Sequence, residues 1–122
     1  MSPSKTRAPR VETDVLLAIK PEHLANIISR EKNHEYRNYR LKDGVLRLWL
    51  YETGSGGGRS SSTHIAVIRP STRHEPGSVP IEPFGIDNED FNAGRKESKY
   101  GYPILELYEL MNPVTLNEMK TR

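Results

Sequence analysis

One stretch of the chain, Asp14 to Arg40 (DVLLAIKPEHLANIISREKNHEYRNYR), decides the fold. It opens with an apolar run that ends at Ile19 and then passes through Lys20-Pro21 into a segment with helical periodicity. The residue before a proline favours extended geometry, and proline itself suits the first helical turn, where its missing N–H is not needed. The stretch therefore predicts a strand, a short helix and then a second, polar strand.

The predicted helix is amphipathic. Leu24, Ile27 and Ile28 follow the spacing i, i+3 and i+4, which places them on one face. So short a helix needs tertiary packing to be stable, so this face is expected to lie against a core. The strand before it is expected to contribute Leu16, Leu17 and Ile19 to the same core.

Residues 33–37 predict the polar strand, whose side chains alternate between two faces. One face carries Asn33, Glu35 and Arg37, and the other carries His34 and Tyr36. A carboxylate and a guanidinium two residues apart on one face can form an ion pair or jointly bind a polar ligand. The simpler alternative is a solvent-exposed pair, which contributes about 0–1 kcal/mol.

The segment 45–51 (VLRLWLY) predicts a central strand, because both of its faces are largely apolar. Trp49 in this strand either packs in the core or offers a platform for a nucleic-acid base. The remaining expected elements are a flexible loop at 53–62, a strand at 64–68, a proline-rich crossing loop at 69–85, a short helix or turn at 90–92, a strand at 102–110 and a C-terminal helix that begins at Thr115.

Length and composition narrow the function classes. With 122 residues the chain is expected to hold one domain, at 13–122, after a disordered basic arm at 1–12. It has no cysteine, which excludes disulfides and thiolate metal sites and is typical of an intracellular protein. The four histidines lack metal-ligand spacing, so neither a metal nor a cofactor is expected. No apolar run is long enough for a secretory leader or a membrane span.

The order of motifs in IKPEHLANIISREKNHEYR (19–37) resembles that of ASCH domains, which belong to the PUA-like superfamily. The family pattern is an apolar strand, Lys/His-Pro, a helix and then Gly-x-Lys-x-x-Glu-x-Arg. This chain matches the pattern at Lys20-Pro21, Lys32, Glu35 and Arg37. It departs at Arg30, where the family has a glycine that permits positive φ past the helix end, and this departure predicts a reshaped turn. LRLWLYETG (46–54) and DFNAGRKESKYGYPILELYEL (90–110) are also similar to the family, and the resemblance covers roughly residues 14–118.

The predicted elements indicate a strand-dominated α+β chain: a small β-barrel of mixed strand direction, with short helices covering its ends. The resemblance implies that this is a PUA-like barrel. It also implies a basic cleft that binds nucleic acid or a nucleotide, RNA more than DNA, in a monomer without membrane association. The candidate ligand-binding residues are Lys20, Lys32, Glu35, Tyr36, Arg37, Arg40, Lys96 and Lys99. Tyr39 and Trp49 are further candidates for stacking with bases, and Glu35 for accepting a hydrogen bond from a base amine.

Two other functions stay open at this point. Some small ASCH proteins resemble amidohydrolases that remove the acetyl group of N4-acetylcytidine, and ribonuclease activity is also associated with the family. Lys32 matches the lysine of the amidohydrolases, but Glu35 stands at the position of their threonine nucleophile, and a carboxylate requires a different mechanism. Lys32 and Glu35 are therefore the catalytic candidates, with catalysis itself undecided. The third function is a protein-interaction module that uses the proline-rich loop as its contact surface.

Overall fold

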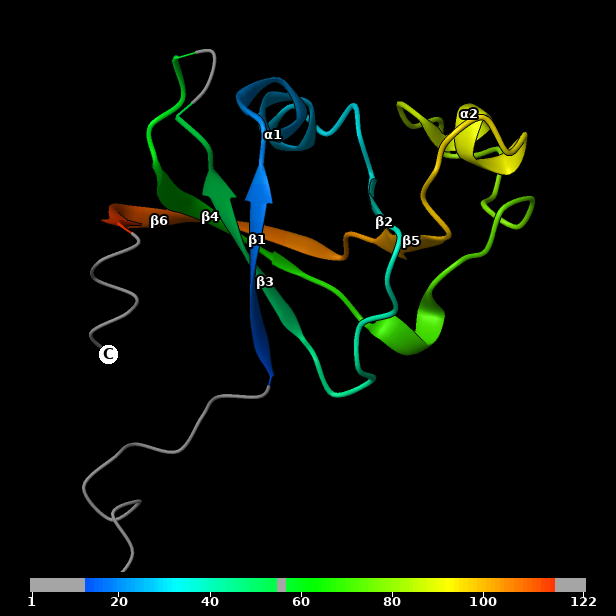
Figure 1. Cartoon of the computed structure of the whole chain (residues 1–122), viewed down its shortest axis with the longest axis horizontal. Coiled ribbons are helices and arrows are strands. Elements are labelled where there is room, and N and C mark those ends of the chain that lie inside the picture. Colours follow the sequence, from blue (N-terminus) through cyan, green and yellow to red (C-terminus); the bar gives the residue numbers. More distant parts are fainter. Residues whose placement is uncertain (1–12, 55–56, 116–122) are drawn as a thin grey trace, which may run out of the picture.

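The computed structural model describes residues 13–54 and 57–115, which form six strands and a few short helices (Figure 1). Their order is β1 (Asp14–Ile19), α1 (Pro21–Ile28), β2 (His34–Arg37), β3 (Arg47–Glu52), β4 (Ser61–Val67), the 3-10 helix η3 (Pro70–Thr72), α2 (Asn88–Asn92), β5 (Tyr100–Pro103) and β6 (Glu106–Thr115). The predicted strand-dominated α+β class is confirmed. The arm predicted at 1–12 lies outside the described residues. So does the predicted C-terminal helix beyond Thr115, which is itself the last residue of β6.

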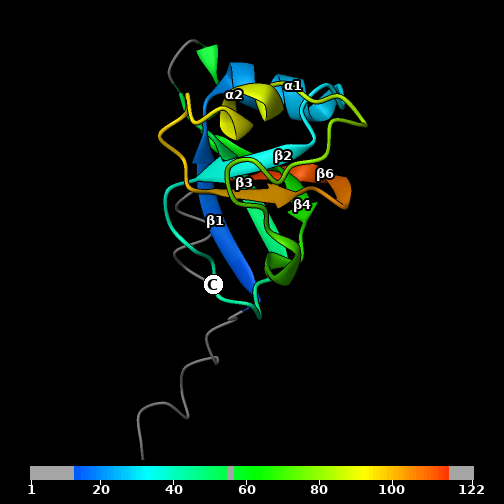
Figure 2. The ribbon, with the colours of Figure 1, turned by 90° about the vertical axis from the view of Figure 1, so that its right-hand side faces the viewer.

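The strands form two sheets. The larger sheet has the order β1-β3-β4-β6, in which β1 and β3 are parallel and the other pairs are antiparallel. The smaller sheet pairs β2 with β5 in antiparallel fashion, and these two strands lie side by side in front of the larger sheet (Figure 2). The strand at 45–51 was predicted to be central, and β3 confirms this because it lies between β1 and β4.

Within the described residues the two sheets are not closed into a barrel, whereas the sequence predicted a small β-barrel of mixed strand direction. In the described part of the chain no ladder of backbone hydrogen bonds joins β1 to β2. Side chains of β2 occupy the space between these strands instead. Arg37 Nη2 donates a hydrogen bond to the backbone oxygen of Ala18, at 3.0 Å. This opening between β1 and β2, called the seam below, is the position of the pocket described in the next section.

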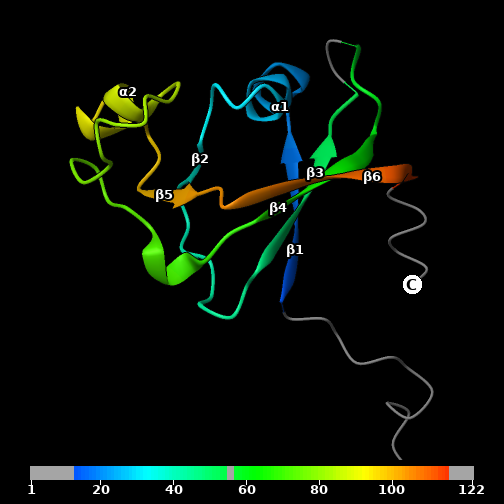
Figure 3. The ribbon, with the colours of Figure 1, turned by 180° about the vertical axis from the view of Figure 1, so that it is seen from behind.

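The strand predicted at 102–110 is two strands that belong to different sheets. Ile104 N–H donates to Asn33 O on the side of the small sheet, whereas Leu105 N–H donates to Val67 O on the side of the large one. Consecutive residues therefore bond in opposite directions, and the chain passes from one sheet to the other at this point. The rear view in Figure 3 shows β5 leading directly into β6.

The main core lies between the two sheets and α1. It contains Leu17, Ile19, Leu24, Ile27, Leu41, Val45, Leu48, Leu50, Ala66, Ile68 and Tyr102. Two expected members, Leu16 and Ile28, are instead 42% and 41% exposed. The hydroxyl of Tyr102 accepts a hydrogen bond from Leu41 N–H at 2.7 Å and donates to Tyr39 O at 3.1 Å. This tyrosine thus fixes the chain that leaves β2.

A second, smaller core lies beneath α2. Its buried members are Tyr36, Val79 and Phe91, with the rings of Tyr36 and Phe91 4.4 Å apart between centroids. Gly101 of β5 faces this cluster, and a Cβ at that position would meet the ring of Tyr36 at about 2.6 Å. The smaller core therefore anchors α2 and the proline-rich loop to β2 and β5.

Two local features differ from the sequence-based expectation. Arg30, which stands at the family glycine, adopts φ of +69° and so keeps the left-handed turn that the glycine would permit. Ser61 and Ser62 belong to β4 and are buried, although the loop was predicted to extend to residue 62. Their register opposite Thr115 and Val114 of β6 accounts for this, because ladder pairing depends on the partner strand and not on local composition.

Candidate functional site

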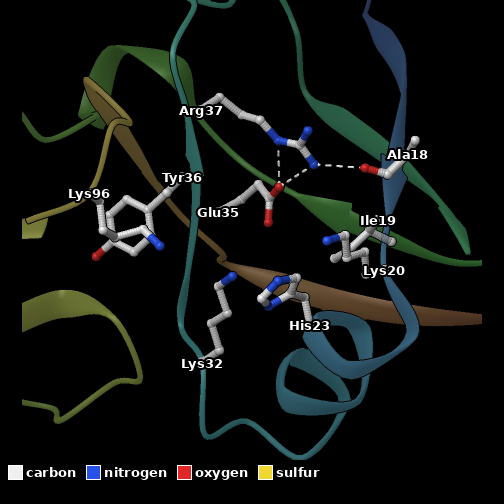
Figure 4. A pocket seen from close by; sticks show the side chains of 9 residues that line it. All are labelled: Ala18, Ile19, Lys20, His23, Lys32, Glu35, Tyr36, Arg37 and Lys96. Carbon is white, nitrogen blue, oxygen red and sulfur yellow. Dashed lines mark hydrogen bonds and ion pairs between the residues drawn. The ribbon is translucent and has the colours of Figure 1, made fainter. Parts of the chain in front are cut away.

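A pocket of about 270 Å³ occupies the seam (Figure 4). It is lined by Ala18, Ile19, Lys20, His23, Lys32, Glu35, Tyr36, Arg37 and Lys96. These residues come from the end of β1, the start of α1, the segment leading into β2, β2 itself and the chain after α2. Four lining side chains are cationic and one is a carboxylate, so the pocket is positively charged.

Glu35 and Arg37 form the polar centre of the pocket wall. Nε and Nη2 of Arg37 contact the same oxygen of Glu35, Oε2, at 2.7 and 2.5 Å. Glu35 is only 3% exposed, so the prediction that the two side chains pair is confirmed, whereas the solvent-exposed alternative is wrong. A fixed, low-dielectric setting makes such a charge-assisted pair stronger than a surface one.

The second carboxylate oxygen of Glu35 has no partner. Oε1 is buried and makes no hydrogen bond within the described residues. Figure 4 shows it directed away from Arg37, toward the part of the pocket where Lys32 and His23 lie. A buried acceptor without a donor is costly, because its desolvation is not compensated by a hydrogen bond. Such an atom in a pocket wall marks a position where a ligand can supply the donor.

Lys32 and Lys96 share one carboxylate, that of Asp87. Their Nζ atoms lie 3.7 and 3.5 Å from Asp87 Oδ2. Lys32 is 6% exposed, which is unusual for a lysine and requires a charged partner. One carboxylate for two ammonium groups leaves net positive charge on this side of the pocket.

Tyr36 is held in the pocket wall by packing and by a chain of side-chain amides. Its hydroxyl donates to Asn88 Oδ1 at 2.5 Å, and Asn88 Nδ2 donates to Asn33 Oδ1 at 2.9 Å. Burial, together with the nearby charge of Asp87, raises the pKa of Tyr36, so the phenol stays protonated and remains a donor. Its ring contacts Phe91, and Lys96 Nζ lies 5.7 Å from its centroid. The ring is thus already packed and leaves little free surface for stacking with a base.

His34 lies on the opposite face of β2 from Glu35. Its Nδ1 is 2.8 Å from Asn33 Oδ1, and its ring stacks on that of Tyr36 with centroids 5.8 Å apart. Burial, followed by the charge of the adjacent His74, lowers the pKa of His34 to about 4. The imidazole is therefore neutral at pH 7, with Nδ1 as the donor to the amide oxygen.

This pKa predicts a loss of stability in mild acid. Because the unfolded chain binds the proton near pH 6.5 and the folded chain only near pH 4, the unfolded state is favoured as the pH falls through that window. We expect the free energy of unfolding to fall by up to about 3 kcal/mol between pH 6.5 and 4. Urea denaturation across this range measures it.

The matched control is His34→Gln, whose amide can still donate to Asn33. This variant should lose much of the pH dependence but not all of it, because burial also lowers the pKa of His64. An equal loss of stability in wild type and variant between pH 6.5 and 4 would show that His34 is not responsible.

The structure brings six of the eight candidate ligand-binding residues to the pocket. They are Lys20, Lys32, Glu35, Tyr36, Arg37 and Lys96. Arg40 does not line it and pairs with Asp43 at 3.4 Å, and Lys99 is exposed outside it. Tyr39 is also exposed outside the pocket, and Trp49 is half-buried with its indole N–H bonded to Asp14 Oδ2 at 2.9 Å. Base stacking by either aromatic within this pocket is thus not supported.

Sequence reasoning missed two residues of the site. His23 lines the pocket and follows Lys20 by three residues, so helical spacing could have placed both on one side. Asp87 holds both pocket lysines although it lies far along the chain from Lys32. It follows the proline-rich loop with φ of +75°, and no local pattern links it to the motif.

The described residues contain no group of three or more histidine, cysteine, aspartate or glutamate side chains that could hold a metal ion. Among the same residues, no helix has the length and apolar character needed to cross a membrane.

Comparison with known proteins gives a match at the level of three-dimensional structure. No protein-family profile matches the chain, and no curated protein matches it. Crystal structures of an ASCH protein from Zymomonas mobilis do. A variant of that protein with phenylalanine in place of a tyrosine superposes with a TM-score of 0.61 at 16% identity, covering 89% of this chain and 80% of that one. The protein without substitutions gives 0.58 at 15% identity, covering 91% and 79%. The chain therefore has the fold of an ASCH domain, as the motifs of residues 19–37 predicted.

Proposed function

We propose that the pocket in the seam binds one nucleotide of a single-stranded nucleic acid, with RNA as the expected ligand. The observation that carries this proposal is the combination of four cationic side chains with one unpartnered carboxylate oxygen, Glu35 Oε1. A ligand that satisfies both must bring negative charge and a hydrogen-bond donor. A nucleotide brings both, through its phosphate and the amino group of its base.

The phosphate is assigned to the lysine side of the pocket. Lys32 and Lys96 carry two charges against the one carboxylate of Asp87, and Lys20 adds a third cation at the start of α1. Ammonium groups act as point charges toward phosphate and need no fixed direction of approach. Arg37 is less available, because Glu35 and the backbone oxygen of Ala18 already occupy its Nε and Nη2 donors.

The base is assigned to Glu35. Its free oxygen can accept a hydrogen bond from an exocyclic amine, which adenine, cytosine and guanine carry and uracil lacks. The pocket volume of about 270 Å³ lies near the lower limit of small-molecule sites, roughly 300 Å³. It suits a single nucleotide and is too small for a base pair, which supports a single-stranded ligand.

The test is a set of titrations with labelled single-stranded RNA, single-stranded DNA and duplex DNA at low and moderate salt. The proposal predicts the tightest binding to single-stranded RNA, with an affinity that falls steeply as the salt concentration rises. Salt-insensitive binding, or no binding to any of the three, would refute the proposal. Turnover of N4-acetylcytidine, followed in parallel, measures whether the pocket is catalytic.

Glu35→Gln is expected to reduce base preference. Glutamine can keep an oxygen toward Arg37 but places an NH2 donor where Oε1 was. We expect wild type to bind oligo(C) or oligo(A) more tightly than oligo(U), and Glu35→Gln to reduce that preference by about tenfold, the value of one hydrogen bond to a charged group. Fluorescence anisotropy with the three oligonucleotides measures it.

The control is Glu109→Gln, which removes the same charge from an exposed position on β6. It should leave the preference unchanged. If Glu35→Gln and Glu109→Gln behave alike, Glu35 does not contact the base.

One observation supports a hydrolase as the second candidate function. Lys32 matches the lysine of the amidohydrolases and lies in the same pocket as Glu35. The residues that line the pocket include no serine or threonine. The lining therefore lacks a hydroxyl nucleophile like the threonine of the amidohydrolases. Turnover that Lys32→Ala abolishes would favour the hydrolase over a binding protein.

A further inference from the structure

Two large apolar side chains stand out from the surface beside α2. Ile81 is 89% exposed and Phe84 is 77% exposed. With Pro80 they form the Phe84 patch, which borders a cavity of about 310 Å³. The rest of the cavity lining is Gly85, Asn88, Glu89 and Asn92. Exposed apolar side chains that form one contiguous patch are typical of an interaction surface or a ligand-binding groove.

The Phe84 patch is held in a fixed position. Asn33 Nδ2 donates to the backbone oxygens of Pro83 and Phe84 at 3.3 and 3.4 Å, and Ile86 N–H donates to Glu31 O at 2.8 Å. Gly85 is packed so closely on Asn33 and Asn88 that a Cβ would clash with both. The exposure of the two side chains is therefore imposed by the surrounding contacts. A surface ordered in advance loses less conformational entropy when it binds.

The charge around the patch is acidic. Residues 74–94 contain five carboxylates and no lysine or arginine. Glu82 makes no ion pair within the described part of the chain, and the side chain of Glu89 is 88% exposed with its nearest cation, on Arg95, 3.9 Å away. This is the reverse of the pocket in the seam, where cations dominate.

The two side-chain amides of the cavity, Asn88 and Asn92, already make hydrogen bonds. Asn88 bonds to Tyr36 and Asn33, and Asn92 Oδ1 accepts from Gly77 N–H and Val79 N–H while its Nδ2 donates to Val79 O. The cavity therefore offers apolar surface and negative charge, and both of its side-chain amides are already held by hydrogen bonds within the chain. Phosphates would be repelled, and two copies meeting patch to patch would bring their carboxylates together.

We propose that the Phe84 patch and its cavity bind a peptide segment of a partner protein that carries at least two large apolar side chains flanked by lysine or arginine. The apolar side chains fill the cavity and cover Ile81 and Phe84, and the basic residues face Glu82 and Glu89. This site is separate from the nucleotide pocket, and it stands whether or not that pocket binds nucleic acid.

The test selects random twelve-residue peptides, displayed on phage, against the full chain. The expected result is enrichment of peptides that have at least two large apolar residues and a net positive charge. Phe84→Ala should weaken the binding of the enriched peptides at least fivefold, a typical effect for an interface residue of this kind. The separate variant Glu89→Lys should weaken the binding of the same peptides by more than Phe84→Ala does. Met111→Ala, at a 98% exposed apolar residue of β6, should leave it unchanged.

Three results would overturn the proposal. The first is no enrichment, or enrichment of peptides that bind wild type and Phe84→Ala equally. The second is a loss of affinity for single-stranded RNA in Phe84→Ala as large as its loss of affinity for the peptides, which would assign the patch to the nucleic acid. The third is self-association in sedimentation velocity that Phe84→Ala abolishes, which would assign the patch to a second copy of the chain.

Discussion

Replacing Lys32 with methionine is expected to weaken the binding of single-stranded RNA by about tenfold, which corresponds to about 1.4 kcal/mol. Lys32 is buried, and among the described residues its Nζ forms an ion pair with Asp87 alone, at 3.7 Å. A cation in such a water-poor position interacts with a phosphate more strongly than a surface lysine does. The slope of log affinity against log salt should also become shallower by about 0.7, the value for one lost phosphate contact on a single strand.

The matched control for this experiment is Lys42→Met. Lys42 is exposed between β2 and β3, does not line the pocket, and loses the same charge on substitution. Its affinity for RNA should stay within a factor of about 2. Equal losses in Lys32→Met and Lys42→Met would mean that only net charge matters, and the assignment of the pocket would then be wrong.

Lys32 is a cleaner probe of the pocket than Arg37. Removing Arg37 leaves the carboxylate of Glu35 buried without its partner, and breaking a buried pair in this way destabilises a fold by about 3–5 kcal/mol. Lys32→Met removes a buried charge and leaves Asp87 paired with Lys96. The free energy of unfolding of Lys32→Met should therefore stay close to that of wild type, so a loss of binding reports on the pocket.

The largest loss of stability is expected for Phe91→Ala. Phe91 is 1% exposed and belongs to a small core, for which the described part of the chain supplies three buried residues, and its ring packs on Tyr36. Truncating a buried phenylalanine costs about 3–5 kcal/mol, through lost burial and the cavity left behind. Because Tyr36 is a wall of the pocket, the affinity for RNA should fall as well. Urea denaturation and an RNA titration of the same preparation measure both effects.

The chain supplies its own control, since Phe84 is the other of its two phenylalanines. Phe84 is exposed, so Phe84→Ala should change the free energy of unfolding by less than about 0.5 kcal/mol. A loss below about 1 kcal/mol for Phe91→Ala would contradict the existence of a second core beneath α2.

Local patterns in the sequence predicted the local structure around several residues that line the pocket. The proline at 21 and the apolar spacing after it placed α1, and alternation along residues 33–37 placed Glu35 and Arg37 on one face. These features depend on neighbours within a few residues, which a sequence displays directly. Lys20 and Lys32 were assigned to one cleft by the resemblance to ASCH domains, and both line the pocket.

The features that sequence reasoning missed depend on distant partners. The switch between sheets at Ile104 and Leu105 depends on their hydrogen bonds to Asn33 and Val67. The alternation of apolar and polar residues in the sequence continues across this point, so the sequence does not indicate where one strand ends and the next begins. Arg30 adopts a left-handed conformation for which glycine is the usual residue, so the arginine at the position of the family glycine predicted a reshaped turn although the positive φ is kept. Asp87 reaches the pocket lysines only because the proline-rich loop folds back against β2.

The seam between β1 and β2 also bears on how such a protein can evolve. No backbone ladder spans the seam within residues 13–54 and 57–115, so side chains determine the width and charge of the pocket. Several of these side chains, including Lys20, His23 and Lys96, belong to neither hydrophobic core. If the pocket binds a ligand as proposed, mutations at these positions are expected to change which ligand it binds, while the ladders and the cores keep the chain folded. Selection can therefore change ligand specificity at this site with little loss of stability. Proteins with this architecture can then diverge in specificity long before they diverge in fold.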